Sequence, residues 1–323
     1  MVIKCNKIPS DKDWKRLSIF GSKKNYFNTE TYFRESWFDG YQEFSTDFTN
    51  KLTRLAVVVL KPEVFAARRA RDVLMLIERH NFKLRVAYKV KYNRHKIRET
   101  WRYQYSEATI DRMSLVDHLY CLGDAMMVIF EDVSPEITMP ASARLHKLKG
   151  ASEERLRTAE SLRSIVKIPN GVVRFFHIPD EPADIVREFG ILFDRQNRFN
   201  IYQDIKSSLV HDYSFIDEMI STLESQHTEH DFCLAKSWDN ILSNIHGYKE
   251  DKIELILDLK NKVDAREEVG WEDIYKLLSS CNCNIYDIIT IASHVIKQDV
   301  DDEFHLIDGD ALRGWDSRYF SNL

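Results

Sequence analysis

The distribution of hydrophobic and polar positions divides the chain into three zones. Residues 1–52 are rich in aromatic and polar side chains without a clear period, which predicts an extension that packs against the rest of the chain. In residues 53–194, short apolar runs alternate with segments that have the period of amphipathic helices. Residues 195–323 contain helical patterns only, which predicts a C-terminal helical domain with a frayed acidic tail from about Asp299.

The middle zone predicts an α+β domain. LAVVVL (55–60) and AMMVIFE (125–131) are continuous apolar runs, KLRVAYKVKYN (83–93) alternates, and VVRFF (172–176) is a further strand candidate. Helical patterns separate these strands and follow the last one: FAARRARDVLMLIERH, HKIRETWRYQY, EATIDRMSLVDHLYC, PASARLHKLKG and ADIVREFGILF. This order predicts a ferredoxin-like βαββαβ antiparallel sheet with helices on one face.

Charge and composition narrow the class of protein. The formal charge of −5 and the pI near 6.1 provide no overall basic field for nucleic acid. No apolar run approaches the roughly 20 residues of a membrane-spanning helix, and the N-terminus lacks the apolar centre of a secretory signal. The 5 cysteines are scattered, as in reduced proteins. We therefore expect a cytoplasmic protein without a membrane or nucleic-acid partner.

One histidine stands at the end of the last predicted strand. His177 follows VVRFF, and Glu188 lies eleven residues later on the next predicted helix. If that helix folds back, the Glu188 carboxylate reaches the imidazole and holds one ring nitrogen, which leaves the other nitrogen as a nucleophile or base. Taken alone, such a histidine is more often structural. Lys61 directly follows the buried run LAVVVL, and strand ends are usual places for site residues.

Three segments together resemble the nucleoside diphosphate kinase family over about residues 53–194: LAVVVLKPEVF, the AMMVIFE run after LGD, and HIPDEPADIVREFGILF. The resemblance implies that His177 is the nucleophile that carries phosphate, that Glu188 orients it, that Lys61 contacts phosphate and that Asp180 is the aspartate of the turn after the histidine. It also implies nucleoside di- and triphosphate substrates, Mg²⁺ bound with the nucleotide, and a homo-oligomer.

The chain also departs from the family pattern. Arg174 stands where the family has the asparagine that contacts the sugar, and Ile178-Pro179 replaces Gly-Ser. Further nucleotide-binding residues of the family correspond approximately to Arg163, to Arg144 or His146, and to Ser152. The family's aromatic residue near the histidine has three candidates, which are Trp101, Tyr103 and Tyr105.

Two functions therefore remain open. The first is a phosphotransferase that moves a γ-phosphate from a nucleoside triphosphate to a nucleoside diphosphate through phospho-His177. The second is a catalytically degenerate nucleotide-binding scaffold whose C-terminal helices bind a protein partner. A metal site is not favoured, because His227, His230 and Cys233 have ligand-like spacing but lack a fourth ligand.

Overall fold

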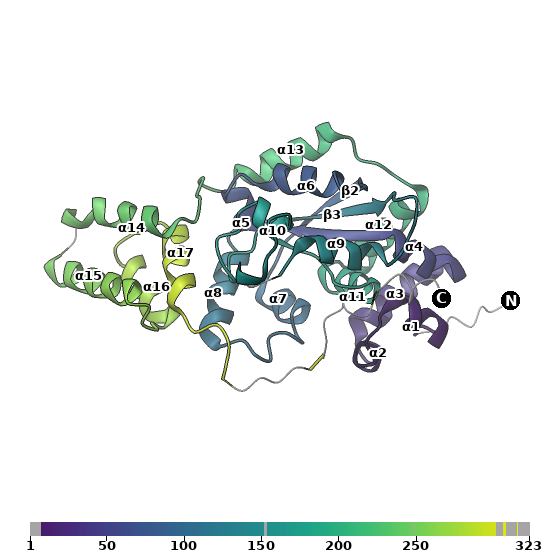
Figure 1. Cartoon of the computed structure of the whole chain (residues 1–323), viewed down its shortest axis with the longest axis horizontal. Helices are drawn as coiled ribbons and strands as arrows, with labels where there is room; N and C mark the ends of the chain where they lie inside the picture. Colours follow the sequence, from purple (N-terminus) through teal and green to yellow (C-terminus); the bar gives the residue numbers. More distant parts are fainter. Residues whose placement is uncertain (1–7, 152–153, 248, 302–305, 308–314, 316–323) are drawn as a thin grey trace.

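The computed structural model describes residues 8–151, 154–247, 249–301, 306–307 and 315 (Figure 1). Its centre is a four-stranded antiparallel sheet with the order β2-β3-β1-β4. The strands are β1 (Leu55–Leu60), β2 (Phe82–Val90), β3 (Ala125–Asp132) and β4 (Phe176–His177). This order is that of the ferredoxin-like βαββαβ arrangement, so the predicted fold class is confirmed.

Helices connect these strands in the predicted order. The connections contain α5 (Pro62–Ala66) and α6 (Ala70–Glu78), then α7 (Arg94–Thr100) and α8 (Ile110–Tyr120), then α9 (Ala141–Lys149) and α10 (Leu162–Ile165); α11 (Pro182–Leu192) follows β4. The single helix predicted over residues 65–80 is wrong, because the chain turns at Arg68 with a positive φ of 56°. The Arg68 guanidinium donates to the carbonyls of Glu224 and His227 at 2.9 Å, and these distant contacts stabilise the break.

The strand predicted over VVRFF is much shorter than expected. Only Phe176 and His177 pair with β1, and Phe175 has a positive φ of 58°. The Asn170 side chain accepts hydrogen bonds from the amides of Val172 and Val173 at 2.9 and 3.0 Å, which folds this segment into a turn. The histidine therefore projects from a two-residue strand that follows a tight turn.

The N-terminal zone is helical, contrary to the aperiodic extension expected from its sequence. It forms α1 (Asp11–Leu17), α2 (Gly21–Phe27), α3 (Thr31–Phe44) and α4 (Phe48–Arg54). Its aromatic residues stack on one another, as in the pairs of Trp14 with Phe33 and of Phe44 with Phe48. The sequence of these helices shows no clear helical periodicity, because aromatic contacts between the helices bury their side chains and one continuous apolar stripe does not. The zone packs against α11, as expected.

The C-terminal zone is helical, as predicted. It comprises α12 (Arg195–Ser207), α13 (Tyr213–Glu224), α14 (Leu234–Ser243), α15 (Glu250–Asp264), α16 (Trp271–Ser279) and α17 (Ile285–Val295). Figure 1 shows α14–α17 together at one end of the molecule, opposite the N-terminal helices, whereas α12 and α13 lie beside the sheet domain. The division at residues 52 and 194 stays a prediction, and most of the acidic tail lies outside the described residues. No helix in the described part of the chain is long and apolar enough to cross a membrane.

A glycine permits the closest contact between the N-terminal zone and the sheet domain. A Cβ atom at Gly190 on α11 would lie 2.1 Å from the carbonyl oxygen of Tyr32 on α3. Because the obstacle is backbone, a side chain at this position requires α3 to move. Gly190 therefore sets how closely the first zone approaches the helix that carries Glu188.

We expect Gly190→Ala to lower the free energy of unfolding by about 1–3 kcal/mol, because α3 and α11 must separate. Gly21→Ala is the matched control, since a Cβ there meets nothing within 4 Å. Urea denaturation of both variants measures the difference. Equal stability of the two variants would contradict the close packing of α3 on α11.

Candidate functional site

The predicted contact between His177 and Glu188 is present. His177 Nε2 lies 2.7 Å from Glu188 Oε1, and the two side chains are 17% and 6% exposed. Glu188 reaches the ring because α11 folds back beside β4 after the turn at residues 178–181. A carboxylate acceptor at Nε2 favours the tautomer with the proton on Nε2, so Nδ1 carries the lone pair.

His177 lies at the wall of a cavity of about 600 Å³. The cavity is strongly cationic, since six basic side chains line it: Lys61, Arg112, Lys147, Lys149, Arg163 and Arg174. Asp180 is the only carboxylate among the described residues that line it. The whole chain is acidic, so this concentration of positive charge is local and suits a polyanionic ligand.

Burial lowers the pKa values of four of these cations, Lys61, Lys149, Arg163 and Arg174. Burial lowers the pKa of Lys61 to about 8, although Glu63 acts in the opposite direction. Burial also lowers the pKa of Lys149 to about 8, and burial together with neighbouring Arg174 lowers that of Arg163 to about 9. The pKa of Arg174 is lowered by burial and by Arg112. An anion in the cavity would stabilise the charged form of each group.

A buried network holds Lys61 in the wall of the cavity. Its ammonium lies 2.8 Å from Glu63 Oε1 and donates to the Tyr120 hydroxyl at 2.7 Å. Lys61 and Glu63 are 1% and 0% exposed, so this ion pair is fully buried. The network orients the ammonium at the cavity wall and compensates part of the cost of burying its charge.

Asp180 occupies the turn between β4 and α11. It lies 2.7 Å from His146 Nδ1 and 3.5 Å from Lys149 Nζ. Although burial acts in the opposite direction, His146 and Lys149 hold the pKa of Asp180 well below its usual range. Asp180 is therefore ionised, with the ammonium of Lys149 nearby and the imidazole of His146, whose pKa burial lowers, at the same oxygen.

Solved structures that resemble this chain are nucleoside diphosphate kinases. The enzyme from Aquifex aeolicus is 14% identical with a TM-score of 0.35, covering 44% of this chain and 96% of its own. The Encephalitozoon cuniculi enzyme is 14% identical with a TM-score of 0.36, and the match covers 43% of this chain and 87% of the enzyme. The Borrelia burgdorferi enzyme, solved with vanadate and ADP, is 16% identical with a TM-score of 0.35, and the match covers 44% of this chain and 88% of the enzyme. Likenesses of this size do not assign a family.

No protein-family model matches the chain, and no curated protein matches it in sequence.

Of the remaining residues implied by the family resemblance, some line the cavity at His177 and others do not. Arg163 and Arg174 line the cavity, where Arg163 donates to the Gly150 carbonyl at 2.7 Å and Arg174 donates to that of Gly171. Arg144 lies elsewhere: it donates to Asp132 at 2.7 Å, and its guanidinium stacks on Phe82. Of the two alternatives from α9, His146 is the one at the cavity, because Arg144 turns toward the β3 end. Ser152 lies outside the described residues.

The aromatic neighbour of the histidine is Trp101, whose ring is 5.2 Å from that of His177 in an edge-on arrangement. Tyr105 stacks on Trp101 and also lines the cavity. Tyr103 instead lies among the N-terminal helices, where its hydroxyl donates to Glu30.

The candidate metal run has other partners. His227 Nδ1 is hydrogen-bonded to the Tyr286 hydroxyl, His230 Nε2 lies 3.0 Å from Asp287 Oδ1, and Cys233 is exposed. In the part of the chain that the structure describes, no group of three or more His, Cys, Asp or Glu side chains is arranged to hold a metal ion. Through these contacts, the two histidines connect the segment that precedes α14 with helix α17.

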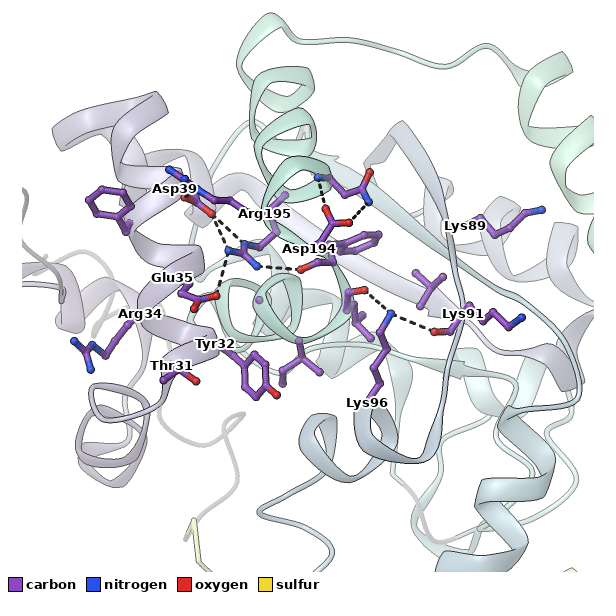
Figure 2. Close-up of a pocket in the computed structure, with 18 residues that line it drawn as sticks. Thr31, Tyr32, Arg34, Glu35, Asp39, Lys89, Lys91, Lys96, Asp194 and Arg195 are labelled. Atoms are coloured by element: carbon purple, nitrogen blue, oxygen red, sulfur yellow. Dashed lines mark hydrogen bonds and ion pairs between the residues drawn. The ribbon is translucent and has the colours of Figure 1, made fainter.

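A larger groove, of about 1100 Å³, lies between α3, the end of α11 and the start of α12, beside the last residues of β2 (Figure 2). Two of its cationic side chains already have partners within the groove. Arg198 donates to Asp39 at 3.0 Å, and Lys96 donates to the Leu192 carbonyl at 2.8 Å. The smaller cavity at His177 is therefore the better candidate for chemistry.

Sequence reasoning missed several cavity residues. Arg112, Lys147 and Lys149 come from helices α8 and α9, and nothing in their spacing indicated that they face His177. Asp299 also contributes, because it forms an ion pair with Arg112. Only the tertiary contact between α8 and the segment after α17 places this carboxylate beside the cavity.

We expect anion binding to weaken as the pH rises through about 8, because Lys61 and Lys149 lose their charge there. The affinity for inorganic triphosphate should fall roughly tenfold between pH 7.5 and 9.5, with protons taken up on binding. Calorimetry in buffers of different ionisation enthalpy measures both effects. A constant affinity without proton uptake would contradict this assignment.

We expect Asp299→Asn to tighten triphosphate binding about threefold to fivefold, because it removes a half-exposed carboxylate that competes for Arg112. Asp301→Asn is the matched control, since Asp301 pairs with Lys297 on the exposed surface. Titration of both variants with inorganic triphosphate at low salt provides the comparison. Identical affinities would show that Asp299 does not act on the cavity.

Proposed function

We propose that this protein is a phosphotransferase of the nucleoside diphosphate kinase type, with His177 as the residue that carries phosphate. The observation that supports this proposal is the hydrogen bond from His177 Nε2 to Glu188, which leaves Nδ1 available at the wall of a cationic cavity. The nucleoside triphosphate donor and diphosphate acceptor come from the sequence resemblance.

The reaction would proceed in two transfers. The Nδ1 lone pair attacks the γ-phosphorus of the donor, an N–P bond forms, and the bond to the bridging oxygen of the β-phosphate breaks. Glu188 stabilises the positive charge that develops on the ring and keeps the proton on Nε2. A diphosphate acceptor then attacks the phosphohistidine, and the ring returns to its starting state.

The basic side chains would bind the phosphate chain and stabilise the transferring group. Arg163 and Arg174 have planar guanidinium groups that suit phosphate oxygens, and Lys61, which directly follows β1, lines the same cavity as His177. Trp101 packs edge-on against the ring of His177 and limits its rotation. These groups are in place before the ligand binds, which lowers the reorganisation that the reaction needs.

Mg²⁺ would enter with the nucleotide. The cavity offers one carboxylate among its described residues, Asp180, so the donors fit a metal held mainly by phosphate oxygens and water. When bound, such a metal neutralises charge on the phosphate chain. Asp180 is the residue that would contact its hydration shell.

Assembly as a homo-oligomer is also part of this proposal, as is a cytoplasmic location. The free edge of β2 is partly covered, because the His211 amide donates to the Arg85 carbonyl at 2.7 Å and His211 Nδ1 accepts from the Ala87 amide at 3.1 Å. Any subunit contact at this edge would therefore be confined to the uncovered end of the strand.

Incubation with ATP labelled at the γ-phosphate should produce an acid-labile, base-stable phosphoprotein, because phosphohistidine has this stability. His177→Ala should abolish the label, and Glu188→Gln should slow its formation about 10- to 100-fold. His95→Ala is the control, since His95 is exposed and lies outside the cavity.

A wild-type protein that stays unlabelled would overturn the phosphotransferase proposal. If that protein still bound ATP or ADP in calorimetry, the nucleotide-binding scaffold would be the better description, with the C-terminal helices as the candidate surface for a protein partner. Light scattering of the same samples measures the oligomeric state.

A further inference from the structure

One buried arginine connects α11 to the end of α7. Arg187 lies on α11 and is 3% exposed. Its guanidinium donates to the backbone carbonyls of Glu99 at 2.6 Å and of Thr100 at 3.1 Å, which are the last two residues of α7. Carbonyls at the end of a helix lack intrahelical partners, so a side-chain donor can satisfy them. Arg187 therefore holds together two helices that are far apart along the chain.

The N-terminal zone supplies the counter-charge for this arginine. Arg187 Nε donates to Glu30 Oε2 at 2.6 Å, and the other carboxylate oxygen of Glu30 accepts from the Tyr103 hydroxyl. The guanidinium also lies against the rings of Phe27 and Tyr103, whose centroids are 5.3 and 5.1 Å from its central carbon. All three nitrogens of the guanidinium donate to a described acceptor, so its orientation is fixed.

The two segments that Arg187 connects also contact His177 from two sides. Glu188 directly follows Arg187, and its carboxylate lies 2.7 Å from His177 Nε2. Trp101 directly follows Thr100, and its ring lies 5.2 Å from that of His177 with 75° between the two planes. Each contact is one residue away from a group of the arginine clamp. The separation of α7 and α11 therefore determines how closely the indole approaches the imidazole.

We propose that Arg187 is a positioning residue for His177, and that Glu30 makes the N-terminal zone a required part of the site. Neither side chain lines the cationic cavity at His177, so neither would contact the phosphate chain. Without the guanidinium, two backbone carbonyls and the Glu30 carboxylate lose a donor in a largely buried place, which is unfavourable. The end of α7 then separates from α11 so that water reaches these groups, and Trp101 withdraws from the imidazole.

This inference rests on the proposed function only where it concerns phosphate transfer. An imidazole held between a carboxylate and an aromatic ring presents Nδ1 to the γ-phosphorus in one orientation. A displacement of about 1 Å at a reacting group can slow a reaction about 100-fold. The position of Trp101 relative to His177 can be measured without any phosphate donor.

The test uses the full chain labelled with ¹³C-histidine and observed by NMR. The carbon-bound ring protons of His177 are identified by their loss in His177→Gln. The nearby indole displaces these signals through its ring current, and Trp101→Leu gives their positions without the indole. Arg187→Met, which keeps the apolar stem and removes the donors, should move the signals most of the way to the Trp101→Leu positions. Spectra over the same range of pH separate this displacement from changes in protonation.

Arg198→Met is the matched control. Arg198 is 4% exposed, donates to Asp39 of α3 at 3.0 Å and donates to the Phe193 carbonyl after α11 at 3.0 Å. It thus joins the same two parts of the molecule through the same kinds of contact, but in the other groove. Arg198→Met should leave the His177 signals at their wild-type positions.

The contribution of the N-terminal zone is tested by Glu30→Ala. Glu30 precedes α3 without forming a side-chain cap hydrogen bond, so this change does not remove a helix cap. It should move the His177 signals in the same direction as Arg187→Met. Because Glu30 acts through Arg187, adding Glu30→Ala to Arg187→Met should produce no further displacement.

In the labelling reaction, Arg187→Met should slow phosphoprotein formation at saturating ATP about 10- to 100-fold. The ATP concentration that gives half the maximal rate should stay unchanged, because Arg187 does not line the cavity that would bind the phosphate chain. Arg198→Met should form phosphoprotein at the wild-type rate.

His177 signals that are the same in Arg187→Met and in the wild type would overturn the role of Arg187, as would an equal displacement in Arg198→Met. Unchanged signals in Glu30→Ala would overturn the role of the N-terminal zone. Should Arg187→Met fail to fold, Arg187→Lys, which keeps the charge but has one nitrogen, provides the same comparison with a smaller displacement. A wild-type protein that stays unlabelled would overturn the phosphotransferase proposal and leave the NMR result unaffected.

Discussion

The His177 site depends on a very short antiparallel contact between β1 and β4. Only two residue pairs form it, Val59 with His177 and Leu60 with Phe176, and the Lys61 amide extends it by donating to the Phe175 carbonyl at 2.8 Å. Since β4 lies at the sheet edge, β1 is its only neighbour in the described sheet. These few bonds bring His177 and Lys61, from distant parts of the chain, into the lining of one cavity.

Charged side chains around this site form ion pairs with residues from distant segments of the chain. From the N-terminal zone, Lys23 pairs with Glu181 and Asp184 at the start of α11, and these carboxylates hold its pKa above the usual value even though burial opposes them. From the C-terminal zone, Asp299 pairs with Arg112. All three zones of the chain therefore contribute charged residues around one site. Burying the cations of the cavity before an anion binds lowers the stability of the folded chain.

The parts of the site that could be predicted from the sequence depend on short-range spacing or on hydrophobic periodicity. The contact between His177 and Glu188 follows from a strand, a short turn and a helix in succession, so the spacing along the chain was sufficient. Lys61 was found because it ends a buried strand. The choice between Arg144 and His146 could not be made from spacing, because it depends on Asp132 and Phe82, which hold Arg144 at the far side of α9.

The sequence by itself determined three strand positions, the approximate place of the fourth strand, the ferredoxin-like class, the helical C-terminal zone and the histidine–glutamate pair, because hydrophobic periodicity and short-range spacing encode them. Tertiary structure alone decided the helices of the N-terminal zone and the cations that surround His177. Each of these depends on contacts between segments far apart along the chain, and a local pattern of residues does not encode such contacts.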